Sequence, residues 1–171
     1  MPQIVEIKAR CVDQAKIRQL LMERNARSVG TDHQVDTYFK VPNGRLKLRE
    51  GKIENNLIHY DRPNQSGPKT SMVNFYKSKP DSTLKVVLET ALGVLTVVDK
   101  QREIYFVDNI KFHLDTVKTL GTFVEIEAID DDMTMTLEFL DLQCREYIAL
   151  FEIKEEDLID HSYSDMVLTN G

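Results

Sequence analysis

The sequence contains few of the residues that mark several common classes of protein. It has only two cysteines among 171 residues, Cys11 and Cys144, and they lie too far apart to form a metal-ligand motif. Both stand in apolar contexts, which predicts reduced thiols in the core. The seven glycines are scattered along the chain, so no glycine-rich phosphate loop is present. A Walker-type nucleotide site is therefore excluded.

Long hydrophobic runs and an excess of positive charge are also absent. The apolar runs are only a few residues long, which is far short of a transmembrane helix. The first ten residues lack the apolar segment of a secretory signal, so we expect a cytoplasmic protein that has no membrane partner. The net charge of −6 argues against a general nucleic-acid partner, because nucleic-acid-binding domains are usually basic.

Three segments of the chain, 4–10, 44–50 and 123–128, place a charged residue at every second position. Successive side chains of a β-strand point to opposite faces, so the charged residues of each segment share one face and the apolar residues share the other. The pattern predicts a sheet with one apolar face and one ionic face. Such an ionic face suits a polyanion that is held together with a divalent metal.

Strand patterns dominate the first two thirds of the sequence, and three amphipathic helical patterns interrupt or follow them. The composition, with 42% hydrophobic and 29% charged residues, predicts one domain over 1–171 with an α+β fold. If the sheet closes, its charged face becomes the lumen, because the helices cover the apolar face; a flat sheet with one solvated face is the alternative. The predicted strands span 3–10, 34–41, 44–50, 57–62, 71–78, 94–107, 110–115 and 121–129, and the predicted helices span 11–24, 80–93 and 132–151.

Three like charges on one strand face, Arg45, Lys47 and Arg49, call for a compensating anion, because alternate residues are only roughly 6.8 Å apart. Lys100 and Arg102 add positive charge on a later strand. Carboxylates recur on other strands, and carboxylates together with water are the ligands that Mg²⁺ and Mn²⁺ prefer. Basic side chains and a carboxylate-bound metal are the usual means of holding and polarising a polyphosphate.

Four sequence pieces together resemble the CYTH domain, that is, the triphosphate tunnel metalloenzyme superfamily, which includes class IV adenylyl cyclases and thiamine triphosphatases. They are the E-x-K of VEIKAR, the hairpin DTYF-VPNGRLKLRE, the K-x-R of VVDKQRE, and HLD-x-V-x-x-LG-x-FVEIE. The resemblance extends from the first strand to about residue 129. SYSDMVL near the C-terminus is similar to the cyclase-type branch.

This resemblance implies an eight-stranded antiparallel β-barrel whose charged lumen binds a small-molecule triphosphate with Mg²⁺ or Mn²⁺. The family signature begins with a glutamate where this chain has Ile4, so the resemblance implies one metal ion rather than two. Arg62, on the predicted strand 57–62, would take the place of a tunnel lysine. The implied triphosphate-binding residues are Lys8, Arg45, Lys47, Arg49, Arg62, Lys100 and Arg102; the implied metal ligands are Glu6, Asp115, Glu125 and Glu127; and the implied catalytic residues are Lys8, Arg102 and Asp115.

The resemblance favours an adenylyl cyclase that converts ATP to cyclic AMP and pyrophosphate. The alternatives are a triphosphatase and a non-catalytic module that binds a phosphorylated ligand. A third alternative is a scaffold protein with an acidic exterior. The oligomeric state is expected to be a monomer or a homodimer. His113 is interpreted as a partner of Asp115, and 160–165 as a loop or lid at one mouth of the tunnel, with His161 and Tyr163 in it.

Overall fold

The computed structural model describes residues 2–61 and 64–170, so the predicted phosphate contact Arg62 lies outside the described residues. The eight strands and their connecting helices follow the predicted order closely. The main difference lies in the second strand, which begins at Arg27 rather than at residue 34. The elements are β1 (Gln3–Arg10), α1 (Gln14–Glu23), β2 (Arg27–Phe39), β3 (Arg45–Glu50), β4 (Asn56–Asp61), β5 (Lys69–Lys77), α2 (Leu84–Leu92), β6 (Val94–Val107), β7 (Ile110–Val117), β8 (Gly121–Asp130), α3 (Leu137–Leu150), the 3₁₀ turn η1 (Glu155–Asp157) and α4 (Tyr163–Asn170).

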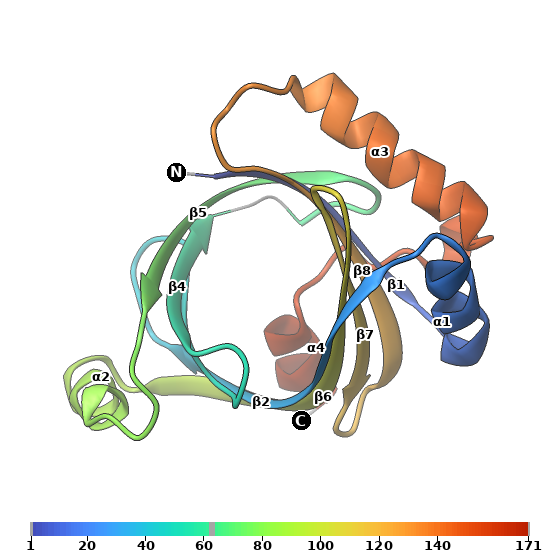
Figure 1. Cartoon of the computed structure of the whole chain (residues 1–171). Helices are drawn as coiled ribbons and strands as arrows, with labels where there is room; N and C mark the ends of the chain where they lie inside the picture. The colour runs from blue at the N-terminus through green and yellow to red at the C-terminus, as the bar shows by residue number, and fades with distance from the viewer. Residues whose placement is uncertain (1, 62–63, 171) are drawn as a thin grey trace.

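The strands form a closed antiparallel barrel in the order β1-β5-β4-β3-β2-β6-β7-β8, and β8 pairs with β1 to complete the ring (Figure 1). This closure confirms the predicted barrel and excludes the flat sheet. Eight strands leave an interior that is just wide enough for side chains or one small ligand. None of the helices within 2–61 and 64–170 is long and apolar enough to cross a membrane.

Tight turns join several neighbouring strands. Asp108 and Asn109 alone connect β6 to β7, and Asp108 has a φ of 50°. Gly44, before β3, has a φ of 63°, and a Cβ atom there would lie 2.7 Å from the Tyr60 carbonyl oxygen. Glycine is therefore required at position 44 both by conformation and by space.

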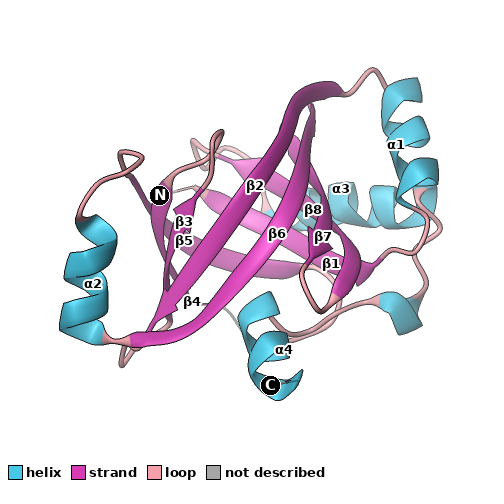
Figure 2. Ribbon diagram, turned by 90° about the horizontal axis from the view of Figure 1, so that it is seen from below, coloured by secondary structure: helices cyan, strands magenta, loops and turns pink. Residues whose placement is uncertain are grey.

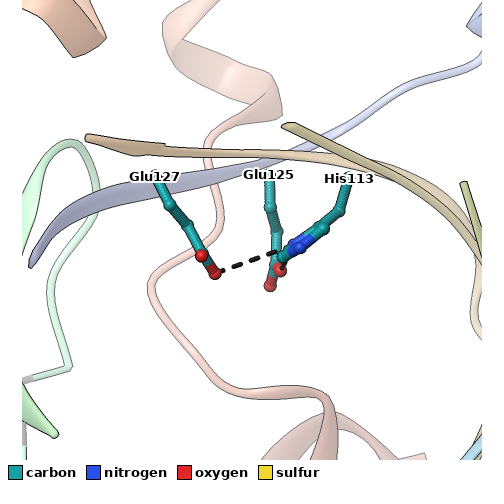
Figure 3. Close-up of side chains that lie close together, drawn as sticks. All are labelled: His113, Glu125 and Glu127. Carbon is teal, nitrogen blue, oxygen red and sulfur yellow. Dashed lines mark hydrogen bonds and ion pairs between the residues drawn. The ribbon is translucent and has the colours of Figure 1, made fainter. Parts of the chain in front are cut away.

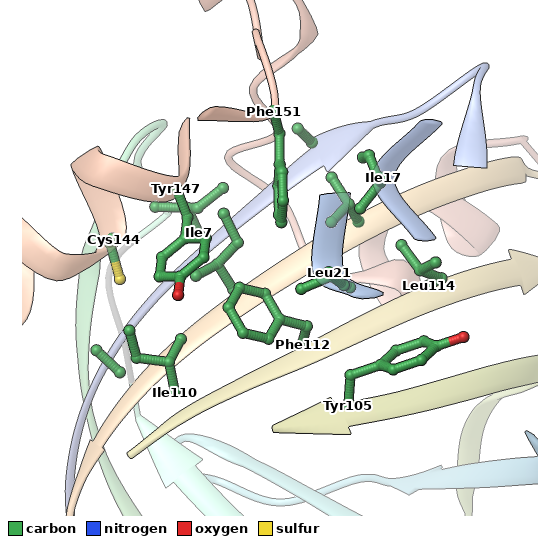
Figure 4. Close-up of a cluster of buried hydrophobic side chains, with 14 of the residues drawn as sticks. Ile7, Ile17, Leu21, Tyr105, Ile110, Phe112, Leu114, Cys144, Tyr147 and Phe151 are labelled. Atoms are coloured by element: carbon green, nitrogen blue, oxygen red, sulfur yellow. The ribbon is translucent and has the colours of Figure 1, made fainter. Parts of the chain in front are cut away.

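The apolar side of the barrel is covered by α1 and α3, which pack on β1, β7 and β8 (Figures 1 and 4). Asp13 caps the start of α1 by accepting a hydrogen bond from the Lys16 amide. Leu21 and Phe112 are fully buried in this core. Cys11 and Cys144 are both free and buried, which confirms the interpretation of the two thiols.

The helix α4 lies at one end of the barrel rather than on its side (Figures 1 and 2). The predicted loop or lid over 160–165 therefore runs into a helix that begins at Tyr163. Tyr163, at the start of this helix, packs against Phe123 and Val98. The other helices lie outside the barrel, and α2 connects β5 to β6.

Candidate functional site: a charged tunnel

The interior of the barrel holds a cavity of about 150 Å³. Alternate residues of every strand point into it, as the period of a β-strand requires. Cations and carboxylates both line it, so the predicted ionic face is the lumen. The lining cations are Lys8, Lys47, Arg49, Lys100, Arg102 and Lys111, and the lining carboxylates are Glu6, Glu54, Glu125 and Glu127.

Asp36, on β2, is the counter-charge at the centre of the basic residues. Its carboxylate accepts two hydrogen bonds from Arg49 at 2.9 and 2.8 Å and one from Lys100 at 2.8 Å, and it lies 3.2 Å from the Lys47 ammonium. Burial alone would raise the pKa of Asp36, but these three cations hold it well below its usual range. The protein itself therefore supplies an anion that compensates the repulsion on β3.

Lys100 is the most completely buried cation of this cluster, because its side chain is 0% exposed. Burial disfavours the charged ammonium and lowers the pKa of Lys100 to about 7, against the opposing effect of Asp36. A polyanion in the cavity would favour the charged form.

Glu54 reaches the lumen from the loop between β3 and β4. Asp32 holds this loop by accepting hydrogen bonds from the backbone amides of Lys52 and Glu54 at 2.7 and 3.0 Å. The Glu54 carboxylate then pairs with Arg49 at 3.3 Å and with Lys111. Burial would raise the pKa of Glu54, but the cations Arg49 and Lys111 lower it, so this carboxylate is charged at neutral pH.

A second ionic cluster links β1, β6, β7 and β8. Arg102 donates to Asp115 at 2.7 and 2.6 Å and to Glu125 at 2.8 Å. Lys8 lies 3.1 Å from the other oxygen of Glu125 and 3.7 Å from the centre of the Tyr163 ring. Burial would raise the pKa of Glu125, but Lys8 and Arg102 hold it well below its usual range. The two-pronged contact fixes the Arg102 guanidinium in one orientation.

His113, Glu125 and Glu127 form the group of potential metal ligands that the described residues bring together (Figure 3). Their ligand atoms lie within 4.8 Å of one another. His113 Nδ1 lies 2.9 Å from Glu125 and 3.6 Å from Glu127. Without a metal, Nδ1–H donates to the charged Glu125 carboxylate, and a metal held between the three side chains would take the place of this proton.

The donor set of this group fits a divalent cation. Burial lowers the pKa of His113, which favours the neutral imidazole that metals bind. Carboxylate oxygens suit Mg²⁺ and Mn²⁺, and the imidazole suits Mn²⁺ better. Glu6 lines the same cavity and pairs in register with Glu127, one strand away.

The segment that leads into α4 crosses one mouth of the tunnel and contacts three strands. The Lys69 ammonium donates to the Asp160 carbonyl oxygen at 2.8 Å. The Arg45 guanidinium lies 2.7 Å from Asp165, and the Tyr163 hydroxyl donates to Asp115 at 2.7 Å. The opposite mouth is bordered by Phe75 and other residues from the far ends of β4 and β5.

Of the predicted site residues that the structure describes, eight line the cavity and two, Arg45 and Asp115, do not. Lys8, Lys47, Arg49, Lys100 and Arg102 line one cavity, as do Glu6, Glu125 and Glu127. Arg45 does not line it, because it lies at the end of β3 that is next to α4, where it binds Asp165. Asp115 does not line it either, because Arg102 and Tyr163 cover its carboxylate.

Several residues of the lumen were missed or misread from the sequence, among them Lys111, which lines the cavity. Asp36 and Glu54 were not assigned to the site, and His113 was paired with Asp115, whereas its partner is Glu125. The inward position of Asp36 follows from alternation with Tyr38, which would have been a usable signal. The position of Glu54 depends on Asp32, 22 residues earlier, and has no local signal.

The family model of the CYTH domain matches residues 3–163 of the chain. The chain therefore belongs to the CYTH family, which confirms the resemblance in the sequence. No protein of curated function matches the sequence.

Several solved structures share the fold at low sequence identity. The PH1012 protein from Pyrococcus horikoshii OT3 is 22% identical, with a TM-score of 0.79 over 95% of this chain and 98% of that chain. A candidate adenylate cyclase from Vibrio parahaemolyticus is 20% identical, with a TM-score of 0.75 over 96% and 97% of the two chains. HpAC1 from Hippeastrum, a candidate adenylyl cyclase described as having a dominant triphosphatase activity, is 14% identical, with a TM-score of 0.60 over 95% and 91%.

Proposed function

We propose that this chain is a metal-dependent enzyme that binds an organic triphosphate in the tunnel, with conversion of ATP to cyclic AMP and pyrophosphate as its leading reaction. The observation that carries the proposal is the shared cavity, which holds six cations next to the group His113, Glu125 and Glu127. Membership of the CYTH family and the likeness to a candidate adenylate cyclase support it.

The cations would hold the phosphates by charge and by hydrogen bonds. Arg49, Lys47 and Lys100 lie around one carboxylate, Asp36, so phosphate oxygens that approach them would share or replace that partner. Arg102 and Lys8 would bind the phosphates nearer to Glu125. Asp115, which touches only Arg102 and Tyr163 among these groups, would orient the guanidinium.

In the cyclisation, the 3′-hydroxyl oxygen of the ribose would attack the α-phosphorus, pyrophosphate would leave, and the hydroxyl proton would pass to water. Reactions of this kind depend on positioning and charge neutralisation more than on a protein nucleophile. Glu125, Glu127 and His113 would hold Mg²⁺ or Mn²⁺. A metal bound there supplies charge that polarises phosphate oxygens.

Hydrolysis of the triphosphate is the second candidate. The same charges that hold the α-phosphate for cyclisation would hold the γ-phosphate for attack by water. The fold likeness to HpAC1, whose description gives a dominant triphosphatase activity, favours this candidate. The two reactions differ in their products, so one assay separates them.

The test is incubation of the purified protein with ATP, GTP, thiamine triphosphate or inorganic tripolyphosphate, each with Mg²⁺ or Mn²⁺, and separation of the products by chromatography. Cyclic AMP with pyrophosphate would support the cyclase, and orthophosphate would support the triphosphatase. Tight binding without any product would leave a binding module. Neither product nor binding by calorimetry would overturn the proposal.

Matched variants separate the site from the rest of the surface. Glu125→Gln with Glu127→Gln should abolish metal-dependent turnover, whereas Glu138→Gln on the outer helix α3 should not. Arg49→Met should weaken triphosphate binding at least tenfold, whereas the exposed Lys118→Met should leave it unchanged. Full activity of the double glutamate variant would place the metal elsewhere.

A further inference from the structure

The residues of β4 and β5 that line the cavity are all uncharged. The inward residues of β4 and β5 are Asn56, Ile58 and Tyr60 on one strand and Ser71, Val73 and Phe75 on the other. Ile4 of β1 and Ile129 of β8 pack against them. We call the group Ile4, Ile58, Tyr60, Val73, Phe75 and Ile129 the apolar wall.

The apolar wall lies across the cavity from the cations of β6 and β7, and the cations of β1 and β3 stand at its two edges. In the ring of eight strands, β5 stands four places from β6, which carries Lys100 and Arg102. Likewise, β4 stands four places from β7, which carries Lys111 and His113 (Figure 1). A ligand in this one cavity therefore meets hydrocarbon on the side of β4 and β5 and charges on the remaining sides.

Phosphate oxygens cannot satisfy their hydrogen bonds against aliphatic side chains, so a triphosphate would lie on the cationic side. The wall must then face either water or an apolar part of the same ligand. Ile58 and Val73 are only 4% and 7% exposed because they pack against each other and against Ile4, whereas Phe75 is 52% exposed and offers the largest accessible apolar surface of the wall.

Ser71 adds a polar group to this wall. Its hydroxyl oxygen is buried, lines the cavity and lacks a hydrogen-bond partner among the described residues. Buried hydroxyls without a partner are rare and call for a missing water or ligand group. One hydroxyl among apolar side chains matches a ring that carries a heteroatom.

Resting on the proposed function, we infer that the apolar wall binds the aromatic ring of an organic triphosphate, with Phe75 available for ring stacking and Ser71 for one hydrogen bond. Ile4 is then a specificity residue of this chain. A glutamate at position 4 would place a carboxylate beside Ile129 and Ser71, its strand neighbours, and would remove apolar contact from the ring.

The test compares the dissociation constants of ATP, thiamine triphosphate and inorganic tripolyphosphate by calorimetry in the same Mg²⁺ buffer. Tripolyphosphate carries at least as much negative charge as either organic ligand, so charge alone would not favour the organic ones. We expect ATP or thiamine triphosphate to bind at least tenfold more tightly than tripolyphosphate. If neither does, while tripolyphosphate binds, the wall has no such role; if none of the three binds, the proposed function itself fails.

Variants of adjacent residues on β5 assign the preference to the wall. Val73 points into the cavity, whereas its neighbour Met72 points outward and is 44% exposed. Val73→Asn should reduce the preference for the organic ligand to less than threefold, and the nearly isosteric Val73→Thr should reduce it partly. Met72→Asn should preserve it. An unchanged preference in the Val73 variants, with tripolyphosphate binding as the check on folding, would overturn the assignment.

Discussion

Asp36 has two opposing effects at the scale of single residues. It neutralises Lys47, Arg49 and Lys100, and it occupies the groups that would bind phosphate. Loss of one partner from a buried ionic cluster usually costs about 3–5 kcal/mol, because charges remain buried without compensation. The carboxylate therefore stabilises the ligand-free barrel and competes with a bound polyanion.

We predict that Asp36→Asn binds tripolyphosphate several-fold more tightly than the unaltered protein, because the competing carboxylate is gone. Its free energy of unfolding should fall by about 3 kcal/mol, as measured by urea denaturation. Asp99→Asn, on the outer face of β6, is the control and should change neither quantity. Weaker binding by a folded Asp36→Asn protein would mean that Asp36 positions the cations rather than competing for them.

Lys100 should take up a proton when a polyphosphate binds. Its pKa is about 7 in the ligand-free protein, because burial disfavours the ammonium, and nearby phosphate charge would raise it. Calorimetric titrations with tripolyphosphate at pH 8 in buffers of different ionisation enthalpy would measure this uptake. The uptake should disappear in Lys100→Met; an equal uptake in that variant would assign the proton to another group.

The same shift has a consequence for stability. An unfolded lysine has a pKa of 10.5, so between about pH 7 and pH 10.5 the unfolded chain binds more protons than the folded one at this residue. The contribution of Lys100 to the free energy of unfolding should therefore rise with pH across this window. Urea denaturation at pH 7 and pH 9 should show a smaller rise for Lys100→Met than for the unaltered protein.

At the scale of elements, the loop between β3 and β4 determines where Glu54 lies. A Cβ atom at Gly51 would lie 2.4 Å from the Asp32 carboxylate that binds this loop. Gly51→Ala should therefore shift the loop, separate Glu54 from Arg49, and cost about 1–3 kcal/mol in the free energy of unfolding. Lys52→Ala, at the exposed neighbouring position, should cost much less. If Gly51→Ala lowers the free energy of unfolding no more than Lys52→Ala does, the loop tolerates the added Cβ atom.

This loop also shows where prediction from the sequence ends. Alternation predicted the strands and their inward faces, because a period of two residues is a local property. It placed Arg45 beside Lys47 and Arg49, but the length of the tunnel and the position of α4 decide that Arg45 binds Asp165 instead. Neither that contact nor the hydrogen bonds that the backbone amides of 52–54 donate to Asp32 can be read from neighbouring residues.

At the scale of the whole molecule, the cavity joins strands from all parts of the chain. Lys8 belongs to β1, Arg49 to β3, Lys100 to β6 and Glu125 to β8. Because β1 and β8 close the barrel, unfolding separates these residues at once. A ligand that binds the lumen therefore stabilises the closed barrel and has little affinity for the unfolded chain.

Tripolyphosphate at 100 times its dissociation constant should accordingly stabilise the protein by about 2.7 kcal/mol. For a chain of this length that corresponds to a rise in Tm of roughly 5–11 °C, measured by calorimetry with and without ligand. Arg49→Met at the same ligand concentration should show about half this rise or less, because tenfold weaker binding lowers the stabilisation to about 1.4 kcal/mol. A rise that is equal in both proteins would indicate binding to the outer surface, where Arg49 has no influence.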